Sequence, residues 1–165
     1  MMKTTKYKNR FFRLVIITCL ILSSFLAPST ATAEISKTEI NGELRQASSE
    51  FLRDLDYETW QLVAYKFPEE DGKLILRIIG YPGSLRIDHP LDLRVESGRK
   101  EWFLNDETLL NQTLANDSRQ AAAEFDLEFL LTEISKNRPL RLSLDGVFSE
   151  LPVPPFVVQE WRSLK

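Results

Sequence analysis

Two stretches decide the fold: residues 60–67 read WQLVAYKF and residues 74–79 read LILRII. Apolar side chains occupy both phases of the two-residue period in each stretch, which is typical of strands that are covered on both faces. The Asp71-Gly72 pair between the two stretches favours a hairpin turn. We therefore predict that they pair as the central antiparallel strands of a sheet.

Outside these central strands, apolar and polar residues mostly alternate. Residues 91–96 (LDLRVE) and 140–145 (LRLSLD) each show the pattern of a strand with one face on a core and the other in water. Trp102 and Leu104 share a phase, and Phe103 lies in the opposite one. The alternation indicates several further short strands.

Turn signals separate the predicted strands. Ser97-Gly98 lies between two alternating runs and predicts a hairpin tip. Residues 81–84 (YPGS) fit a type II turn, because proline fixes the first central φ and glycine accepts the positive φ of the second. Residues 54–57 are expected to turn the preceding strand back onto the strand that begins at Trp60.

Two segments change to a helical period. In residues 127–134 the apolar side chains fall at i, i+3, i+4 and i+7, which predicts a short helix that ends before Asn137 and Pro139. Near the C-terminus, Pro154-Pro155 precedes a second apolar face of helical spacing, and proline is well tolerated in a first turn. A final extended strand is the alternative for this tail.

Together these patterns predict a mainly β fold: an antiparallel β-sandwich or open barrel of six to eight strands with one or two short helices. We expect one β-rich domain over residues 49–165. Residues 34–48 are polar and weakly patterned, and we expect them to be a flexible N-terminal segment with at most a short strand near Leu44.

Residues 1–33 have the three parts of a secretory signal. The first 13 residues contain five basic residues and no acid, residues 14–26 are largely apolar, and the segment ends Ala31-Thr32-Ala33. We expect cleavage after Ala33. A retained membrane anchor is the alternative, but a spanning helix needs about 20 apolar residues. We therefore expect no stable membrane span after cleavage.

The remaining chain is acidic and lacks cysteine. Residues 1–33 carry five positive charges and no negative ones, and the whole chain has a net charge of −3, so residues 34–165 carry about −8. This charge argues against nucleic acid as a partner and suits a protein that docks to a basic patch. The one cysteine, Cys19, lies within the signal, so disulfides and thiol chemistry are not expected after cleavage.

The sequence provides no evident catalytic set. His89 is the only histidine, so a histidine-rich metal site is excluded within one chain, and no Gly-x-Ser-x-Gly motif supplies a nucleophile for it. We interpret His89 as a structural or surface residue. The run Asp54-x-Asp56-x-Glu58 could offer oxygens to calcium, but a polar turn is favoured. We expect no catalytic residue, no cofactor and no metal site.

Four residues are candidates for contact with a ligand or partner: Arg77, Tyr81, His89 and Trp161. Arg77 lies on an otherwise apolar strand, so a buried guanidinium needs a partner such as Asp88 or Glu101. It could form an internal ion pair or act as a specificity group in a cavity. Most of the aromatic residues are expected in the core, and Tyr81, beside a turn, is expected to be exposed.

Five stretches resemble a family of cyanobacterial exported proteins that is catalogued only as a domain of unknown function: residues 52–61 (LRDLDYETWQ), 80–91 (GYPGSLRIDHPL), 124–127 (EFDL), 138–142 (RPLRL) and 153–161 (VPPFVVQEW). The resemblance spans residues 50–162. It implies a cyanobacterial source and hence the periplasm or the thylakoid lumen, and it carries no catalytic residues.

These observations favour a non-enzymatic accessory protein that is exported and soluble and docks to an unidentified protein partner. That partner would belong to a membrane complex, photosynthetic for example, or to the cell envelope, with Tyr81 and Trp161 as contacts. The alternative is a small-molecule carrier, with Arg77 and aromatic residues lining a barrel that holds an anionic lipid or pigment. An enzyme that uses carboxylates alone is the third hypothesis.

Overall fold

Strands β3 (Thr59–Lys66) and β4 (Leu74–Ile79) form the middle of a five-stranded antiparallel sheet, sheet A. They pair from Lys66 with Leu74 to Gln61 with Ile79, which confirms the predicted central hairpin. Both faces of the two strands are packed against apolar side chains. The apolar residues in both phases of the sequence are explained by this double coverage.

The structure is a computed structural model that describes residues 35–40, 42–66, 72–81, 87–116 and 121–165. The chain divides into two units, residues 1–32 and 33–165, and all described residues belong to the second. The expected signal, most of the turn around Asp71 and the predicted type II turn after Tyr81 lie outside the described residues.

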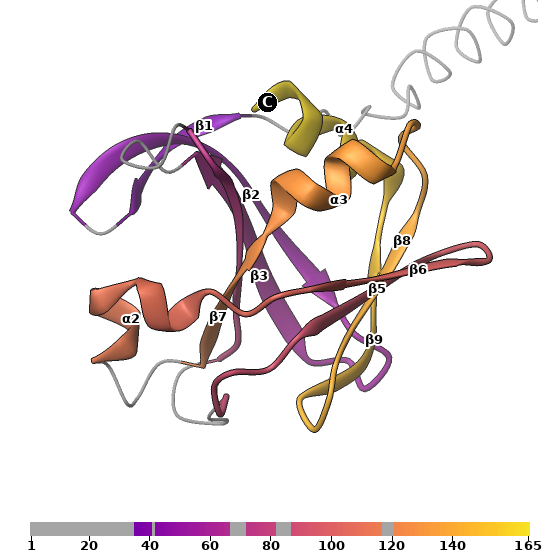
Figure 1. The fold of residues 1–165 in the computed structure, drawn as a ribbon, viewed down its shortest axis with the longest axis horizontal. Coiled ribbons are helices and arrows are strands. Elements are labelled where there is room, and N and C mark those ends of the chain that lie inside the picture. The colour runs from indigo at the N-terminus through magenta and orange to yellow at the C-terminus, as the bar shows by residue number, and fades with distance from the viewer. Residues whose placement is uncertain (1–34, 41, 67–71, 82–86, 117–120) are drawn as a thin grey trace, which may run out of the picture. The chain divides into compact units, whose positions relative to one another are not determined.

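Nine strands are present in the described part of the chain, and all their pairings are antiparallel (Figure 1). Sheet A has the order β1-β2-β3-β4-β7 and sheet B the order β6-β5-β8-β9. The other strands are β1 (Ser36–Ile40), β2 (Glu43–Arg53), β5 (Leu93–Ser97), β6 (Lys100–Leu104), β7 (Ala122–Asp126), β8 (Leu140–Leu144) and β9 (Phe148–Val153).

The predicted class, a mainly β antiparallel sandwich or open barrel, is confirmed, with one strand more than the expected maximum. The additional strand comes from residues 34–48. They were expected to be flexible, but β1 and β2 pair from Ser36 with Ala47 to Ile40 with Glu43. Here tertiary packing overrides weak patterning, because Ile40 and Ala47 bury their side chains in a cluster on sheet A.

The two sheets are linked by single contacts at both sides. On one side an isolated bridge joins Asp106, just after β6, to Phe125 of β7. On the other side the Leu55 amide in the β2–β3 turn donates to the Glu150 carbonyl of β9 over 3.2 Å. The sandwich is therefore open rather than a barrel with a continuous ladder.

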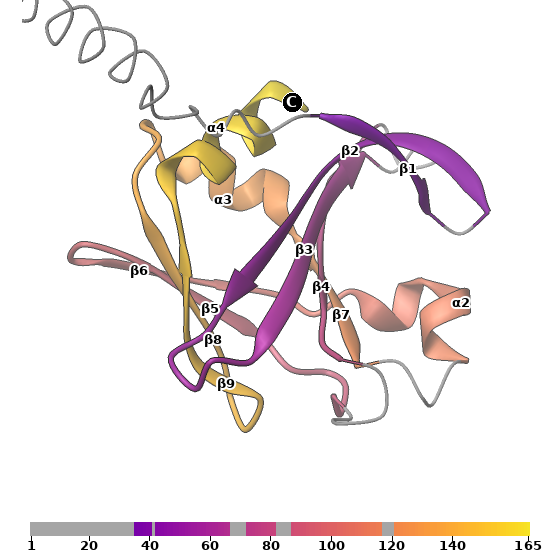
Figure 2. The same ribbon diagram turned by 180° about the vertical axis from the view of Figure 1, so that it is seen from behind.

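The space between the sheets is filled by apolar side chains. The largest of these are fully buried and include Trp161, Phe125 and Leu62. Two helices close one end of this main core, α3 (Leu127–Glu133) and α4 (Pro155–Ser163), and both views show them side by side (Figures 1 and 2). Both predicted helices are thus confirmed.

A smaller apolar cluster lies on the other face of sheet A. It contains Ile40, Ala47, Val63, Tyr65 and Ile75, with Ile79 packed against it. Near this face the chain forms a short 3-10 helix, η1 (Thr108–Leu110), and a one-turn helix, α2 (Gln112–Ala115), neither of which the sequence pattern predicted. We call this side the outer face of sheet A.

Candidate functional site

The side chains of β4 alternate between the two faces of sheet A. Leu74, Leu76 and Ile78 enter the main core, so Arg77 faces the outer side. There it lies directly opposite Glu124 in the β4–β7 register, and its Nε donates to Glu124 Oε1 over 2.6 Å. Arg77 is therefore placed on the face of sheet A opposite the main core.

Glu124 is the centre of a buried polar group, which we call the Glu124 cluster: Tyr65, Arg77, Asn111 and Glu124. The Tyr65 hydroxyl donates to Glu124 Oε1 over 2.5 Å, and Asn111 Nδ2 lies 3.1 Å from Oε2. Arg77 also donates to the Tyr65 hydroxyl and stacks its guanidinium over the Tyr65 ring at 5.3 Å. Glu124 is only 2% exposed, so these donors replace the water that its carboxylate loses on burial.

Asn111 connects this cluster to α2. Its Oδ1 accepts hydrogen bonds from the amides of Thr113 and Leu114, which is the usual role of an N-cap residue. Its Nδ2 at the same time points to Glu124. One side chain therefore both starts the helix and attaches it to the sheet.

A second group, Asp106 with His89 and Thr108, holds the seam between the sheets. Asp106 Oδ2 lies 2.5 Å from His89 Nδ1 and accepts from the Leu91 amide over 2.9 Å. Its Oδ1 accepts from the amide and hydroxyl of Thr108. The Thr108 hydroxyl in turn accepts from the Glu124 amide over 2.8 Å, so the two polar groups are continuous.

Burial acts to raise the pKa of both Asp106 and Tyr65, and at Asp106 hydrogen bonds act against it. Burial by itself would raise the pKa of Asp106, but the hydrogen bonds from Thr108, His89 and the Leu91 amide outweigh it and leave the pKa below its usual value. Burial raises the pKa of Tyr65, and the adjacent Glu124 carboxylate raises it further. The Tyr65 hydroxyl therefore keeps its proton throughout the physiological pH range and donates a hydrogen bond to Glu124.

The carboxylate oxygens of Glu124 and Asp106 are engaged in structural hydrogen bonds. The Glu124 carboxylate already accepts from three side chains, and Asp106 accepts from four donors. Such an arrangement fixes the position of η1 and α2 against sheet A and closes the seam beside β7. We therefore assign the Glu124 cluster a positioning role.

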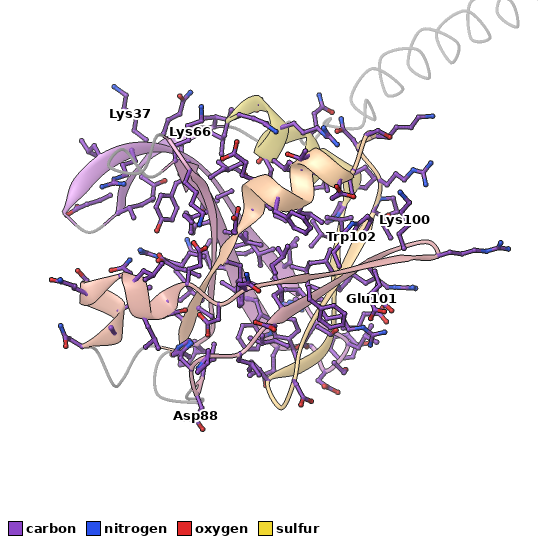
Figure 3. The ribbon with its side chains drawn as sticks, viewed as in Figure 1. Lys37, Lys66, Asp88, Lys100, Glu101 and Trp102 are labelled. Atoms are coloured by element: carbon purple, nitrogen blue, oxygen red, sulfur yellow. The ribbon has the colours of Figure 1, made fainter. Side chains whose placement is uncertain are left out.

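The structure places the four candidate residues from the sequence in different environments. Arg77 and His89 belong to one connected network, and the acid that contacts Arg77 there is Glu124, which was not among the expected partners Asp88 and Glu101. Glu101 lies on the β5–β6 hairpin and pairs with Arg94 instead (Figure 3). Tyr81 is 74% exposed, as expected. Trp161 is fully buried in the main core, so its expected role as an exposed contact is wrong.

The acidic run near Asp54 forms a turn. Asp54 Oδ1 accepts from the amides of Asp56 and Glu58, and Oδ2 accepts from Trp60 Nε1 over 2.8 Å. Both oxygens are therefore engaged within the turn, in keeping with the favoured interpretation. Across the described ranges no group of three acidic, histidine or cysteine side chains is arranged to hold a metal ion.

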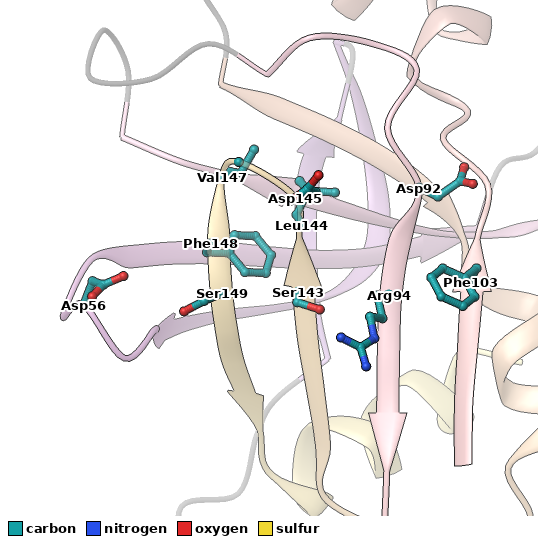
Figure 4. Close-up of a pocket in the computed structure, with 11 residues that line it drawn as sticks. Asp56, Asp92, Arg94, Phe103, Ser143, Leu144, Asp145, Val147, Phe148 and Ser149 are labelled. Carbon is teal, nitrogen blue, oxygen red and sulfur yellow. The ribbon is translucent and has the colours of Figure 1, made fainter. Parts of the chain in front are cut away.

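The outer face of sheet B carries an open groove of about 570 Å³. It is lined by Asp56, Asp92, Arg94, Phe103 and residues 143–149 of the β8–β9 hairpin (Figure 4). Arg94 lies between Phe103 and Ser143 in register, so the three side chains form one row across β6, β5 and β8. We call this surface the sheet B groove.

Charge in the groove is unbalanced. Arg94 pairs with Glu96 over 2.8 Å and with Glu101, so its positive charge is already compensated. The three aspartates that line the groove, Asp56, Asp92 and Asp145, are exposed and form no ion pair with the described residues. The sheet B groove is therefore anionic.

Apolar side chains accompany these charges. Phe103 is 58% exposed, and in the β2–β3 turn Leu55 and Tyr57 flank Asp56 with 59% and 81% exposure. Tyr57 has a φ of 65°, a left-handed conformation that is uncommon for a residue with a Cβ. The bonds to Asp54 and the Leu55–Glu150 contact hold this turn beside β9.

The sequence pattern missed this surface as a site, although it contained a signal. Phe103 lies out of phase with Trp102 and Leu104, and an aromatic residue on the polar side of an alternating strand is the observation that could have identified it. Which acids line this groove could not be predicted, because they come from three separate segments of the chain.

No helix in the described ranges combines the length and the apolar character needed to cross a membrane.

One family model matches the chain, over residues 33–164, and its family is described as a protein of unknown function (DUF3122). Comparison with curated proteins and with solved structures finds no match.

Proposed function

The chain belongs to the DUF3122 family, and we propose that it is an exported, soluble accessory protein that binds a partner protein and does not itself catalyse a reaction. The sheet B groove is the docking surface in this proposal. Its partner belongs to a membrane complex or to the cell envelope.

The observation that carries this proposal is the groove on the outer face of sheet B, with its exposed aromatic side chains among the described residues. Phe103 stands exposed on β6 at one edge of the groove, and Tyr57 is presented near the opposite edge, on a left-handed turn beside β9. Exposed aromatic side chains on a rigid scaffold are the usual anchors of protein interfaces. A strained conformation at an exposed tyrosine also favours a functional explanation, since a glycine or asparagine would fit the turn at a lower cost.

The compartment in this proposal follows from the signal in residues 1–33. A basic start, an apolar middle and the Ala31-Thr32-Ala33 end support export and cleavage. The match to the family model covers residues 33–164, which is within one residue at each end of the portion expected after cleavage, 34–165. We further propose a cyanobacterial source, with the periplasm or the thylakoid lumen as the location.

A carrier with an interior ligand receives less support. The core between the sheets is filled with apolar side chains such as Trp161 and Phe125. Arg77, the expected anion ligand, lies on the outer face of sheet A and pairs with Glu124. The Arg77 guanidinium, which would have oriented a bound lipid or pigment, therefore pairs with Glu124 instead.

Site-specific photo-crosslinking tests the proposal. A photoreactive amino acid at position 103 should yield a discrete crosslinked product in cells that produce the protein natively, and the same amino acid at Phe129 of α3 is the matched control. Phe129 is also a partly exposed aromatic residue, but it lies on a helix at the end of the main core. Equal crosslinking at both positions, or none at position 103, would reject the groove as the docking surface.

A further inference from the structure

We infer that the occupant of the sheet B groove is an extended, cationic segment of the partner protein, with lysine or arginine side chains directed at Asp56, Asp92 and Asp145. This inference rests on the proposed function and identifies the chemistry of the partner. It is drawn from the charges, the exposed aromatic ring and the layout of the groove.

Charge complementarity gives the sign of the partner. Among the described residues that line the groove, Arg94 is the one cation, and it is held by Glu96 and Glu101 on the same face. Arg141 approaches Glu96 as well, at 3.6 Å, so these four groups balance one another. The aspartates around the groove remain without a described partner, and an incoming cation can pair with them without breaking an existing contact.

The layout of the aspartates favours a segment over a single ion. Asp92 precedes β5, Asp145 follows β8 and Asp56 lies in the turn attached to β9, and Figure 4 shows the three carboxylates at separate places around the groove. Three adjacent strands span about 10 Å between the outer two. A hard metal ion needs oxygens that converge within about 2.6 Å of it. Separated carboxylates instead suit several cations along one chain.

An extended chain matches this spacing. Alternate side chains on one face of an extended segment lie about 7 Å apart, so cations two or four residues apart can reach two of the aspartates. Phe103 adds a second attraction, since its exposed ring can accept an arginine guanidinium or an aliphatic lysine stem. The groove therefore favours a sequence in which basic residues alternate with uncharged ones.

The test uses a defined probe rather than an unidentified protein. The protein, in the form that its cells accumulate, is titrated with a synthetic peptide of alternating lysine and threonine, and binding is followed by calorimetry and by NMR amide shifts. The same peptide with every lysine acetylated is the control, because acetylation removes the charge and keeps the length. Asp92→Asn and Asp145→Asn are the test variants, and Glu39→Gln, an exposed acid on β1, is the matched control variant.

We expect amide shifts at residues 92–94, 103 and 143–149, and a dissociation constant that rises about two- to fivefold for each neutralised aspartate. Raising the salt concentration should weaken binding further, because exposed charges are screened. Binding of the acetylated peptide with equal affinity, or equal effects of Glu39→Gln and Asp145→Asn, would overturn the inference.

The two proposals fail differently. If position 103 crosslinks to a partner whose binding responds neither to salt nor to Asp92→Asn, the docking function stands and the cationic segment is wrong. If position 103 crosslinks to nothing while the lysine peptide binds the groove, the chemistry of the groove is right and the proposed docking function is wrong.

Discussion

Arg77 and Glu124 are direct cross-strand neighbours in the β4–β7 pairing, and both nitrogens of the guanidinium that contact Oε1 do so at 2.6 Å. The Glu124 side chain is 3% exposed and that of Arg77 is 11% exposed. Removing one member of such a pair leaves the other charge buried and uncompensated, which gives the first prediction.

Glu124→Ala should lower the free energy of unfolding by about 3–5 kcal/mol. Urea denaturation followed by fluorescence measures this change. Arg94→Ala is the control, since its ion pairs on sheet B are exposed to solvent and its loss should change the stability far less. In the double variant Glu124→Ala/Arg77→Met the loss should be smaller than the sum of the two single losses. Additive losses would show that the pair is not coupled.

We expect the protein to lose stability in acid as Asp106 becomes protonated. Its pKa is lowered in the folded protein, so its contribution to stability is complete above the ordinary aspartate value of 3.8 and is lost as the pH falls through the lower folded value. The melting temperature should therefore fall steeply below about pH 4. In Asp106→Asn the protein should be less stable at pH 7 but should show a shallower acid slope. An unchanged slope would contradict the assignment.

We expect the contribution of Glu50 to stability to have the opposite dependence on pH. Burial raises its pKa, and the nearby Glu160 carboxylate raises it further. A raised pKa favours the protonated form in the folded state, so a destabilising contribution develops as the pH rises above the ordinary value of 4.5. Glu50→Gln should therefore raise the melting temperature slightly at pH 7 and leave it unchanged at pH 4. Glu39→Gln is the control, and an equal gain in that variant would point to net charge instead.

Gly80 lies too close to Trp60 to accept a side chain. A Cβ at position 80 would lie 2.8 Å from Trp60 Cζ3, and the indole cannot move freely because it donates to Asp54 and packs on Phe148 at 4.9 Å between ring centroids. Gly80→Ala should lower the free energy of unfolding by about 1–3 kcal/mol, measured by urea denaturation. A loss of unfolding free energy below the error of the measurement would mean that the Trp60 indole moves aside to accommodate the Cβ.

Replacing Tyr57 should affect stability and partner binding in opposite directions. Its left-handed φ of 65° should cost about 1–2 kcal/mol relative to glycine, so Tyr57→Gly should be at least as stable as the parent protein despite the entropy lost by glycine on folding. Crosslinking at position 103 should at the same time decrease, because the exposed ring beside the groove is gone. Tyr57→Phe keeps the ring and should retain crosslinking. Full crosslinking in Tyr57→Gly would remove Tyr57 from the interface.

Much of the fold could be predicted because it depends on local patterns. The two-residue period identified most strands, and the spacing of Leu127, Leu130 and Leu131 identified α3, whose first turn is capped by Asp126. The hairpin β1–β2 and the short η1–α2 segment were missed for a common reason. These segments are held in place by contacts with sheet A rather than by an apolar period of their own. Ile40 packs in the outer cluster, and Asn111 donates a hydrogen bond to Glu124.

The candidate site was less accessible from the sequence. Exposure of Tyr81 followed from a turn, but Trp161 was misjudged as a partner contact, because the apolar helical face that it shares with Val157 and Val158 packs into the main core. The partner of Arg77 could not be chosen among 24 acidic residues, since cross-strand pairing joins residues 47 positions apart.

The sequence by itself determined the β class, the central position of β3 and β4, the two helices and the excess of negative charge over residues 34–165. These properties depend on the period and the composition of short segments. Only the tertiary structure decided that Arg77 meets Glu124 and that Asp56, Asp92 and Asp145 line one groove with Phe103. Such contacts are set by strand order and register, which bring together side chains that no local pattern relates.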